Sequence, residues 1–215
     1  MTYRLVLFDF DGTLADSLDW FLGVFDQVAD RYGYRRLGPG DRERLRGLET
    51  RAILRDLGIP PWKVPLIARH MRALAARDIA AIRLFPDAAA MLDALYGRGI
   101  QVAVASSNSE ENVRHVLGPA ATHVTRFACG ASLFGKAAKI RAVLRATRTD
   151  PRAALLVGDE ARDVAAARAA RIDSAAVAWG YTDPAFLRSL SPTLFFERIA
   201  DIALVVSRAA TAVSR

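Results

Sequence analysis

The sequence has a single cysteine and no long apolar run near its start. Because Cys129 has no second cysteine to pair with, an internal disulfide and a cysteine-rich metal cluster are excluded, and one thiol is typical of a reducing compartment. The chain reaches the charged Asp9 after a few apolar residues, too few for a signal peptide or a membrane-spanning helix. We therefore expect a cytoplasmic protein that has no part in a membrane.

Lysine is also scarce, so arginine carries most of the positive charge. The 215 residues hold 30 lysines and arginines against 23 acidic residues, a formal net charge of +7, and the only lysines are Lys63, Lys136 and Lys139. The arginines are spread over the chain, whereas nucleic-acid binding favours a basic block with interleaved aromatic residues. We expect solvated helix faces to explain this charge, and no nucleic acid partner.

The chain shows no repeat of fixed period, no low-complexity tract and no linker between independent domains. Its 52% hydrophobic content is enough to bury a large core. From Leu18 onward, apolar residues recur at three- and four-residue steps, which is the period of an amphipathic helix. We predict an all-helical cap domain at residues 16–82, inserted into a core domain formed by residues 1–15 and 83–215.

After residue 83, apolar strands alternate with helices. Strands joined by helical crossovers form a parallel sheet that is covered on both faces, so we predict an α/β, doubly wound core. The predicted strands are residues 5–8, 101–105, 126–129, 153–157, 174–178 and 194–196, and the predicted helices are residues 88–96, 110–117, 136–147, 161–170, 186–190 and 199–213.

Two carboxylates, Asp9 and Asp11, follow the first predicted strand, and Gly12 marks the turn after it. At ~4 Å and an effective dielectric of about 20, two like charges repel by on the order of 4 kcal/mol. The pair therefore needs a cation, a proton on one partner, or a wider separation. The alternative is that both are simple turn residues.

Polar residues follow two later strands in the same way. They are Ser106, Ser107 and Asn108 after residues 101–105, and Asp159, Glu160 and Asp163 after residues 153–157. Each cluster alone has an alternative explanation as a helix cap. Because the carboxyl ends of parallel strands share one edge of a sheet, where helix N-termini also bind anions, the clusters together predict a single site.

These residue types suit the hydrolysis of a phosphate ester, a reaction so slow that several catalytic effects must converge. A carboxylate nucleophile divides the reaction into two displacements, and a second carboxylic acid protonates the leaving oxygen. Magnesium takes hard oxygen ligands, which Asp9 and Asp159 offer. A hydroxyl and a cation must hold the other phosphoryl oxygens, and Ser106 and Lys136 fit these roles.

Four motifs in order give the chain a resemblance, over nearly its whole length, to the haloacid dehalogenase superfamily, in its phosphoglycolate phosphatase-like branch with a helical C1-type cap. They are Asp9-Phe10-Asp11-Gly12-Thr13-Leu14, Val104-Ala105-Ser106-Ser107-Asn108, Gly135-Lys136, and Gly158-Asp159-Glu160-Ala161-Arg162-Asp163. The resemblance implies a Rossmann-like core, a magnesium cofactor, and phosphatase activity on a small phosphorylated metabolite. Whether the protein is a monomer or a homodimer stays open.

The resemblance also implies a role for each motif residue. Asp9 would be the nucleophile and a metal ligand, and Asp11 the general acid and base whose backbone carbonyl also binds the metal. Asp159 would ligate magnesium, Asp163 would lie in or just behind the metal shell, and Lys136 would pair with the nucleophile and the phosphate. The predicted substrate-binding residues are Thr13, Ser106, Ser107, Asn108 and Arg51.

Two of these assignments have competitors. The third motif departs from the common Lys-Pro form because Ala137 follows Lys136, and Lys139 lies near enough to take the same role; the preceding Gly135 favours Lys136. In the cap, Arg51 or Arg46 could bind a substrate carboxylate with a two-pronged guanidinium contact, and the alternative is that both lie on the surface.

Other functions compete with a phosphatase. A sugar phosphomutase of the β-phosphoglucomutase type uses the same four motifs, and the sequence hardly separates the two. A dehalogenase is disfavoured because relatives that cleave carbon–halogen bonds lack the acid that Asp11 supplies in this sequence. A phosphonatase would need a lysine in the cap, and Lys63, between Pro61 and Pro65, is poorly placed for that role. A non-enzymatic anion- or nucleic-acid-binding protein and a phospho-accepting signalling domain are less favoured.

Overall fold

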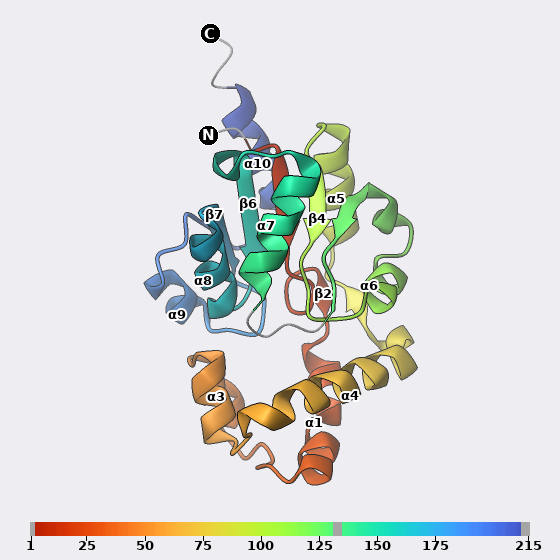
Figure 1. Ribbon diagram of the computed structural model, residues 1–215, viewed down its shortest axis with the longest axis vertical. Coiled ribbons are helices and arrows are strands. Elements are labelled where there is room, and N and C mark those ends of the chain that lie inside the picture. The colour runs from red at the N-terminus through yellow and green to blue at the C-terminus, as the bar shows by residue number, and fades with distance from the viewer. Residues whose placement is uncertain (1–2, 131–134, 212–215) are drawn as a thin grey trace.

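The fold is built on a six-stranded parallel sheet (Figure 1). The structure is a computed structural model and describes residues 3–130 and 135–211. The strands lie in the order β5 (Val124–Phe127), β4 (Gln101–Val104), β1 (Leu5–Phe8), β6 (Ala154–Gly158), β7 (Asp173–Val177) and β8 (Leu194–Phe196). This confirms the predicted doubly wound α/β fold, with the first strand of the chain in the middle of the sheet.

Helices cover both faces of the sheet because side chains alternate along each strand. From β1, Val6 and Phe8 pack on one face and Leu5 and Leu7 on the other, and all four are fully buried. The first face is covered by α5 (Ala88–Gly97), α6 (Glu110–Leu117) and α10 (Ala200–Thr211), and the second by α7 (Lys136–Thr147) and α8 (Ala161–Ala170). Each such side chain contributes roughly 1.5–3 kcal/mol on burial.

Most predicted boundaries agree with the structure. The helices at 110–117, 136–147 and 161–170 and the strand at 194–196 have the predicted limits. The strand predicted at 126–129 begins earlier, at Val124, because Val124 is buried and pairs with Val102 directly after the 3-10 helix η3 (Gly118–His123). The predicted helix at 186–190 is α9 (Pro184–Ser189), which begins earlier because Asp183 caps its first amides.

Residues 18–81 form a separate helical lobe at the bottom of Figure 1. Its helices are α1 (Leu18–Tyr32), α2 (Asp41–Arg46), α3 (Thr50–Asp56) and α4 (Val64–Arg77), with 3-10 turns η1 (Pro61–Lys63) and η2 (Ile79–Ala81). Buried apolar residues from several of these elements, Phe25, Ala29, Leu45, Leu57, Ile59 and Val64, give the lobe its own small core. The exact division into cap and core domains stays a prediction.

A short antiparallel ribbon connects the lobe to the sheet, and the sequence pattern did not indicate it. Strand β2 (Ala15–Asp16) pairs with β3 (Arg83–Leu84), so Asp16, predicted within the helical segment, lies in this ribbon. Two-residue strands are too short to show a period, which is why the alternation rule misses them. None of the described helices is both long and apolar enough to cross a membrane.

Candidate active site

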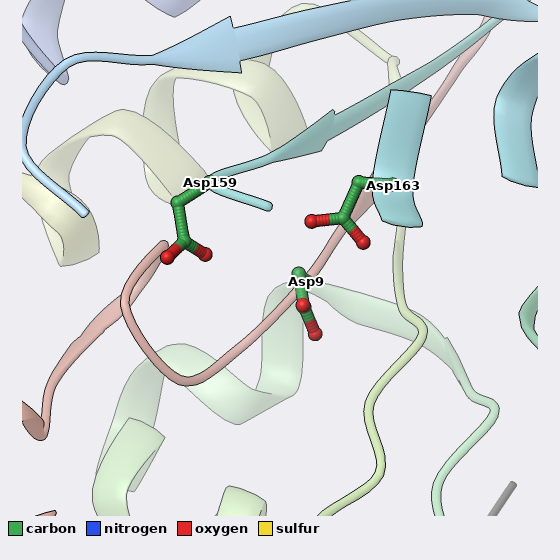
Figure 2. A group of neighbouring side chains, drawn as sticks. All are labelled: Asp9, Asp159 and Asp163. Carbon is green, nitrogen blue, oxygen red and sulfur yellow. The ribbon is translucent and has the colours of Figure 1, made fainter. Parts of the chain in front are cut away.

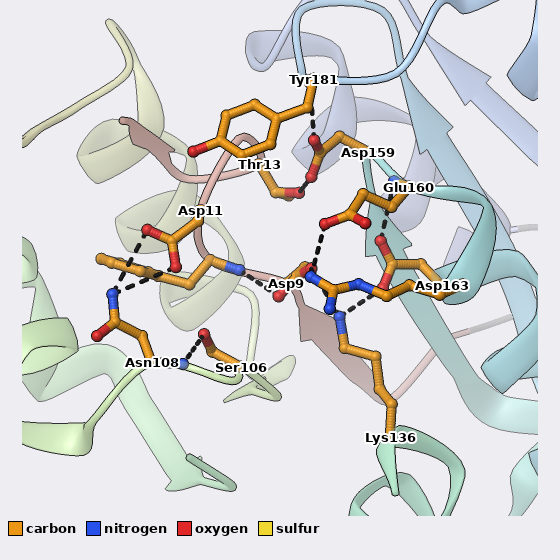
Figure 3. A network of polar contacts seen from close by, with 12 residues as sticks. Asp9, Asp11, Thr13, Ser106, Asn108, Lys136, Asp159, Glu160, Asp163 and Tyr181 are labelled. Atoms are coloured by element: carbon orange, nitrogen blue, oxygen red, sulfur yellow. Dashed lines mark hydrogen bonds and ion pairs between the residues drawn. The ribbon is translucent and has the colours of Figure 1, made fainter. Parts of the chain in front are cut away.

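The candidate site lies where the three central strands end. Phe8, the last residue of β1, is in register with Val104 of β4 and Val157 of β6, so the loops after these strands begin side by side. These loops carry Asp9, the 106–108 segment and Asp159 (Figure 3). The structure therefore brings together the three clusters that the strand pattern predicted at one edge of the sheet.

Asp9 is buried at the start of the first loop, with 3% of its surface exposed. Its Oδ1 accepts a 2.8 Å hydrogen bond from the amide of Phe10, and its Oδ2 lies 2.7 Å from the Nζ of Lys136. Apart from this ion pair, Asp9 Oδ2 accepts no hydrogen bond from the described residues. One carboxylate oxygen is thus held by the backbone, and the other faces the site.

The structure separates the two competing lysines. Lys136, at the first position of α7, forms ion pairs with both Asp9 and Asp163. Lys139 lies one turn further along, and its Nζ donates 2.6 Å hydrogen bonds to the carbonyls of Ser106 and Gly130. Lys136 therefore contacts the predicted nucleophile, whereas Lys139 joins two loops.

Three carboxylates converge in the site. One oxygen from each of Asp9, Asp159 and Asp163 lies within 4.8 Å of the others, and all three residues are buried (Figure 2). Asp159 accepts hydrogen bonds from the Thr13 hydroxyl (2.7 Å) and from the Tyr181 amide (2.8 Å). Asp163 accepts a 3.0 Å bond from the Glu160 amide at the start of α8. Each carboxylate is thus fixed by a neighbouring loop.

Two glycines make room for Asp159. Gly12 has φ of +76°, which favours glycine, and a Cβ there would overlap the Asp159 carboxylate. A Cβ at Gly180 would also overlap the Asp159 side chain. Asp159, with none of its surface exposed, therefore sits in a cradle that only glycine leaves open.

The electrostatics of this group suit a divalent cation. Burial raises the pKa of Asp159 well above its usual value, and the charges of Glu160 and Asp9 raise it further. Burial raises the pKa of Asp163 to about 6 against the opposing charge of Lys136. For Asp9, burial is outweighed by Lys136 and Arg162, and its pKa lies below the usual value. The buried acids outnumber the bases beside them, and oxygen ligands of this kind suit Mg²⁺.

Asp11 lies beside this group, and its carboxylate is not one of the three that converge. It accepts hydrogen bonds from Asn108 Nδ2 (3.2 Å) and from Ser17 Oγ (3.1 Å). Burial, and then the charge of Asp9, raise the pKa of Asp11 to about 6. A carboxyl group with such a pKa can give and take a proton near neutral pH, as a general acid must. Metal binding through its backbone carbonyl stays a prediction.

The loop after β4 presents small polar groups to the site. The buried Ser106 Oγ accepts a 3.0 Å bond from the Asn108 amide, and Asn108 Oδ1 accepts from the amide of Ser109 and from Asn112. These bonds hold the Ser106 hydroxyl and the Asn108 amide group in place. Their predicted contact with phosphate stays a prediction.

The model of the haloacid dehalogenase-like hydrolase family matches residues 6–177. The chain belongs to this family. Membership of a hydrolase family confirms the predicted superfamily and decides against the non-enzymatic alternatives.

The relatives of this hydrolase carry phosphatase names and, in one case, a kinase name. The phosphoglycolate phosphatase of Synechococcus elongatus is 29% identical over 95% of this chain and 98% of its own length. The tyrosine-protein kinase PtkA of Mycobacterium tuberculosis is 30% identical over 89% of this chain and 67% of its own. A crystal structure of a predicted phosphatase from Clostridium acetobutylicum superposes with a TM-score of 0.82 at 16% identity, over 97% of this chain and all of that one. The expected class, a phosphoric monoester hydrolase, is confirmed at this level.

Two residues of this hydrolase belong to the site although sequence reasoning did not include them. Arg162 donates to Glu160 (2.6 Å), lies 4.0 Å from Asp9 Oδ2, and its Nε has no acceptor among the described residues. Because Arg162 lies inside the fourth motif, its position in the sequence could have marked it as a site residue. Tyr181 shares a 2.6 Å hydrogen bond with Ser17 through its hydroxyl, and no local pattern marks it.

Three predicted substrate-binding side chains have other partners or remain untested. Thr13 donates its hydroxyl to Asp159, which places it with the carboxylates. Arg46 donates to the carbonyls of Tyr181 (2.9 Å) and Gly180 (3.2 Å), so it joins the helical lobe to the core. Arg51 lines a cavity of about 380 Å³, together with Ser106, Ser107, Lys136 and Arg162. Contact of Arg51 with a substrate carboxylate stays a prediction.

Proposed function

We propose that the protein is a magnesium-dependent phosphatase that hydrolyses a phosphomonoester through an aspartyl-phosphate on Asp9. One arrangement carries this proposal: Asp9 Oδ2 lies 2.7 Å from Lys136, oxygens of Asp159 and Asp163 lie within 4.8 Å, and Asp11 stands to one side. A nucleophile, a proton donor and a set of metal ligands are thus within reach of one phosphate group.

The metal would be held by Asp9, Asp159 and Asp163, with Thr13 and the Tyr181 amide orienting Asp159. When bound, Mg²⁺ offsets the repulsion between carboxylates and phosphate and draws charge from the phosphoryl oxygens. Partners that orient the ligands commonly change metal affinity 10- to 100-fold. The contacts that hold Asp159 in its buried cradle are therefore expected to affect metal affinity and, through it, activity.

The residues of the chain supply the two displacements. In the first, Asp9 attacks phosphorus, the bond from phosphorus to the ester oxygen breaks, and that oxygen takes the proton of Asp11. In the second, Asp11 takes a proton from water, the water oxygen attacks phosphorus, and inorganic phosphate leaves while Asp9 is restored. The pKa of about 6 for Asp11 suits both directions of proton transfer.

The same site holds groups that suit the other phosphoryl oxygens. Ser106 offers a hydroxyl, and Lys136 and Arg162 offer positive charge beside Asp9. Donors that are already in place when charge builds up are typically the largest contribution to such catalysis. Arg162 Nε, which is buried and lacks an acceptor among the described residues, is available for this purpose.

The test is release of inorganic phosphate from a panel of phosphate esters, with and without Mg²⁺, by the protein and by its Asp9→Asn variant. The panel includes 2-phosphoglycolate, because relatives carry the name phosphoglycolate phosphatase, and a hexose 1-phosphate. We expect magnesium-dependent phosphate release that falls at least a thousandfold in Asp9→Asn. Turnover that persists in this variant would reject the covalent mechanism, and isomer formation without phosphate release would favour the phosphomutase.

A further inference from the structure

A cavity of about 400 Å³ extends from the candidate general acid, between the core and the helical lobe, to apolar residues of the lobe's own core such as Phe25 and Leu45. On the core side it is lined by Asp11 and Asn108, and on the lobe side by Phe21 of α1 and Met71 of α4. Pockets of roughly 300–1,000 Å³ hold ligands of drug size. A two-carbon leaving group such as glycolate would leave most of this space unfilled.

The lobe side of the cavity is mostly aromatic and aliphatic, although Arg42, Arg46, Thr50 and Arg72 also line it. Helix α1 contributes Leu18 and Phe21, and helix α4 contributes Ile67 and Met71. Hydroxyl or carboxylate groups placed against such a wall lose their hydrogen bonds to water without gaining new ones. The wall therefore favours an apolar group over a sugar or a carboxylate.

The guanidinium groups that line the deeper part of the cavity each have at least one acceptor from the protein, and Arg162 Nε, which has none among the described residues, is assigned to the phosphate. Arg46 donates to the carbonyls of Gly180 and Tyr181, Arg72 reaches the Ser107 carbonyl at 3.5 Å, and Arg162 pairs with Glu160. Arg42, the other arginine of the lining, is exposed. A carboxylate in the cavity would have to compete with these contacts.

The position of the cavity connects it to the reaction. When the ester bond breaks, the leaving oxygen takes its proton from Asp11, so the rest of the leaving group must extend past Asp11 and away from the phosphate. The cavity begins at Asp11 and continues to Phe21 and Met71. The space is therefore continuous with the position that the leaving group must take.

We propose that the leaving group of the substrate is an uncharged, largely apolar alcohol that occupies this cavity. The inference rests on the proposed phosphatase function. It names Phe21, Ile67 and Met71 as specificity-determining residues that contact the alcohol and not the phosphate.

The experiment compares n-alkyl phosphates from ethyl to hexyl, with 2-phosphoglycolate beside them. Along this series the chemistry at phosphorus is the same and only the buried apolar surface grows, so kcat/KM reports contact with the cavity. Full burial is worth about fourfold per methylene. We expect kcat/KM for hexyl phosphate to exceed that for ethyl phosphate, and that for 2-phosphoglycolate, by tenfold or more.

A matched pair of variants locates the effect. Ala68 on α4 lines the cavity, whereas Ala73 on the same helix is exposed and does not. Ala68→Trp should lower kcat/KM for hexyl phosphate at least tenfold more than that for ethyl phosphate, and Ala73→Trp should leave the chain-length dependence as it was. Thermal unfolding checks that both variants fold. If Ala68→Trp does not fold, the alkyl series on the unsubstituted protein tests the apolar leaving group by itself.

The possible failures can be told apart. If ethyl phosphate and 2-phosphoglycolate are hydrolysed and kcat/KM does not rise with chain length, or 2-phosphoglycolate is the best substrate, the apolar leaving group is rejected and the phosphatase stands. If the folded protein with Mg²⁺ releases phosphate from none of these esters or of the wider panel, the proposed function itself fails.

Discussion

The hydroxyl of Thr13 donates a 2.7 Å hydrogen bond to Oδ1 of Asp159, across 146 residues of sequence. Both side chains are buried, with 1% and 0% of their surface exposed. This contact joins the first and fourth motifs, and it directs one carboxylate of the candidate metal site. Charged acceptors make such bonds stronger than those between neutral groups.

We predict that Thr13→Val weakens magnesium binding, because valine has nearly the same shape but cannot donate to Asp159. The magnesium concentration that gives half-maximal activity should rise about tenfold, in line with the effect of groups that orient metal ligands. Thr13→Ser keeps the hydroxyl and is the matched control. Equal magnesium titrations for the two variants would show that the contact has no part in metal binding.

The two lysines of α7 should have different roles. Lys136→Met leaves Asp9 and Asp163 without their ion-pair partner, and we expect kcat to fall more than a hundredfold. Lys139→Met removes donors to the Ser106 and Gly130 carbonyls, so it should lower the free energy of unfolding by about 1–3 kcal/mol while kcat falls less than tenfold. Steady-state kinetics and thermal unfolding of both variants check this, and a greater loss of kcat in Lys139→Met would reverse the assignment.

Arg162 is expected to bind phosphate. Arg162→Met removes a guanidinium 4.0 Å from Asp9 Oδ2, and we expect kcat/KM to fall at least tenfold and the inhibition constant of inorganic phosphate to rise. Arg168→Met, on the exposed side of the same helix, is the control. If phosphate inhibits the Arg162 variant as strongly as the unsubstituted protein, Arg162 only pairs with Glu160.

Asp11 should make the metal-free protein less stable at neutral pH. Its pKa is raised from 3.8 to about 6 on folding, first by burial and then by Asp9. A raised pKa means that the stability linked to the protonated group is complete below about pH 4 and is lost as the pH rises through about 6. Because Asp11 is only partly buried, we expect Asp11→Asn to gain on the order of 1 kcal/mol above pH 6, roughly 2–4 °C in Tm.

Thermal unfolding of both proteins with a chelator, at pH 7.5 and at pH 4, measures this effect. The gain in Tm should be present at pH 7.5 and absent at pH 4. A gain of the same size at both values would mean that the substitution acts through packing and not through the charge of Asp11.

Local patterns were enough to predict most of the core. Asp9, Ser106 and Asp159 each follow an apolar strand, and because parallel strands end at the same edge of a sheet, the sequence pattern predicted that these side chains would lie at one edge. The limits of α6, α7 and α8 were also predicted, because each helix has a clear apolar period between turn residues. Those features depend on residues close together in the chain.

The sequence by itself determined the doubly wound core and the clusters at its edge, because strand period, helix period and turn chemistry are local properties. Only the tertiary structure showed that Lys136 contacts Asp9 while Lys139 does not, joined Arg46 to the Tyr181 loop, and formed the apolar cavity beside Asp11. Each of these depends on which side chains approach from distant segments. These contacts form only when whole helices and strands pack together, so the residue period within a single segment does not predict them.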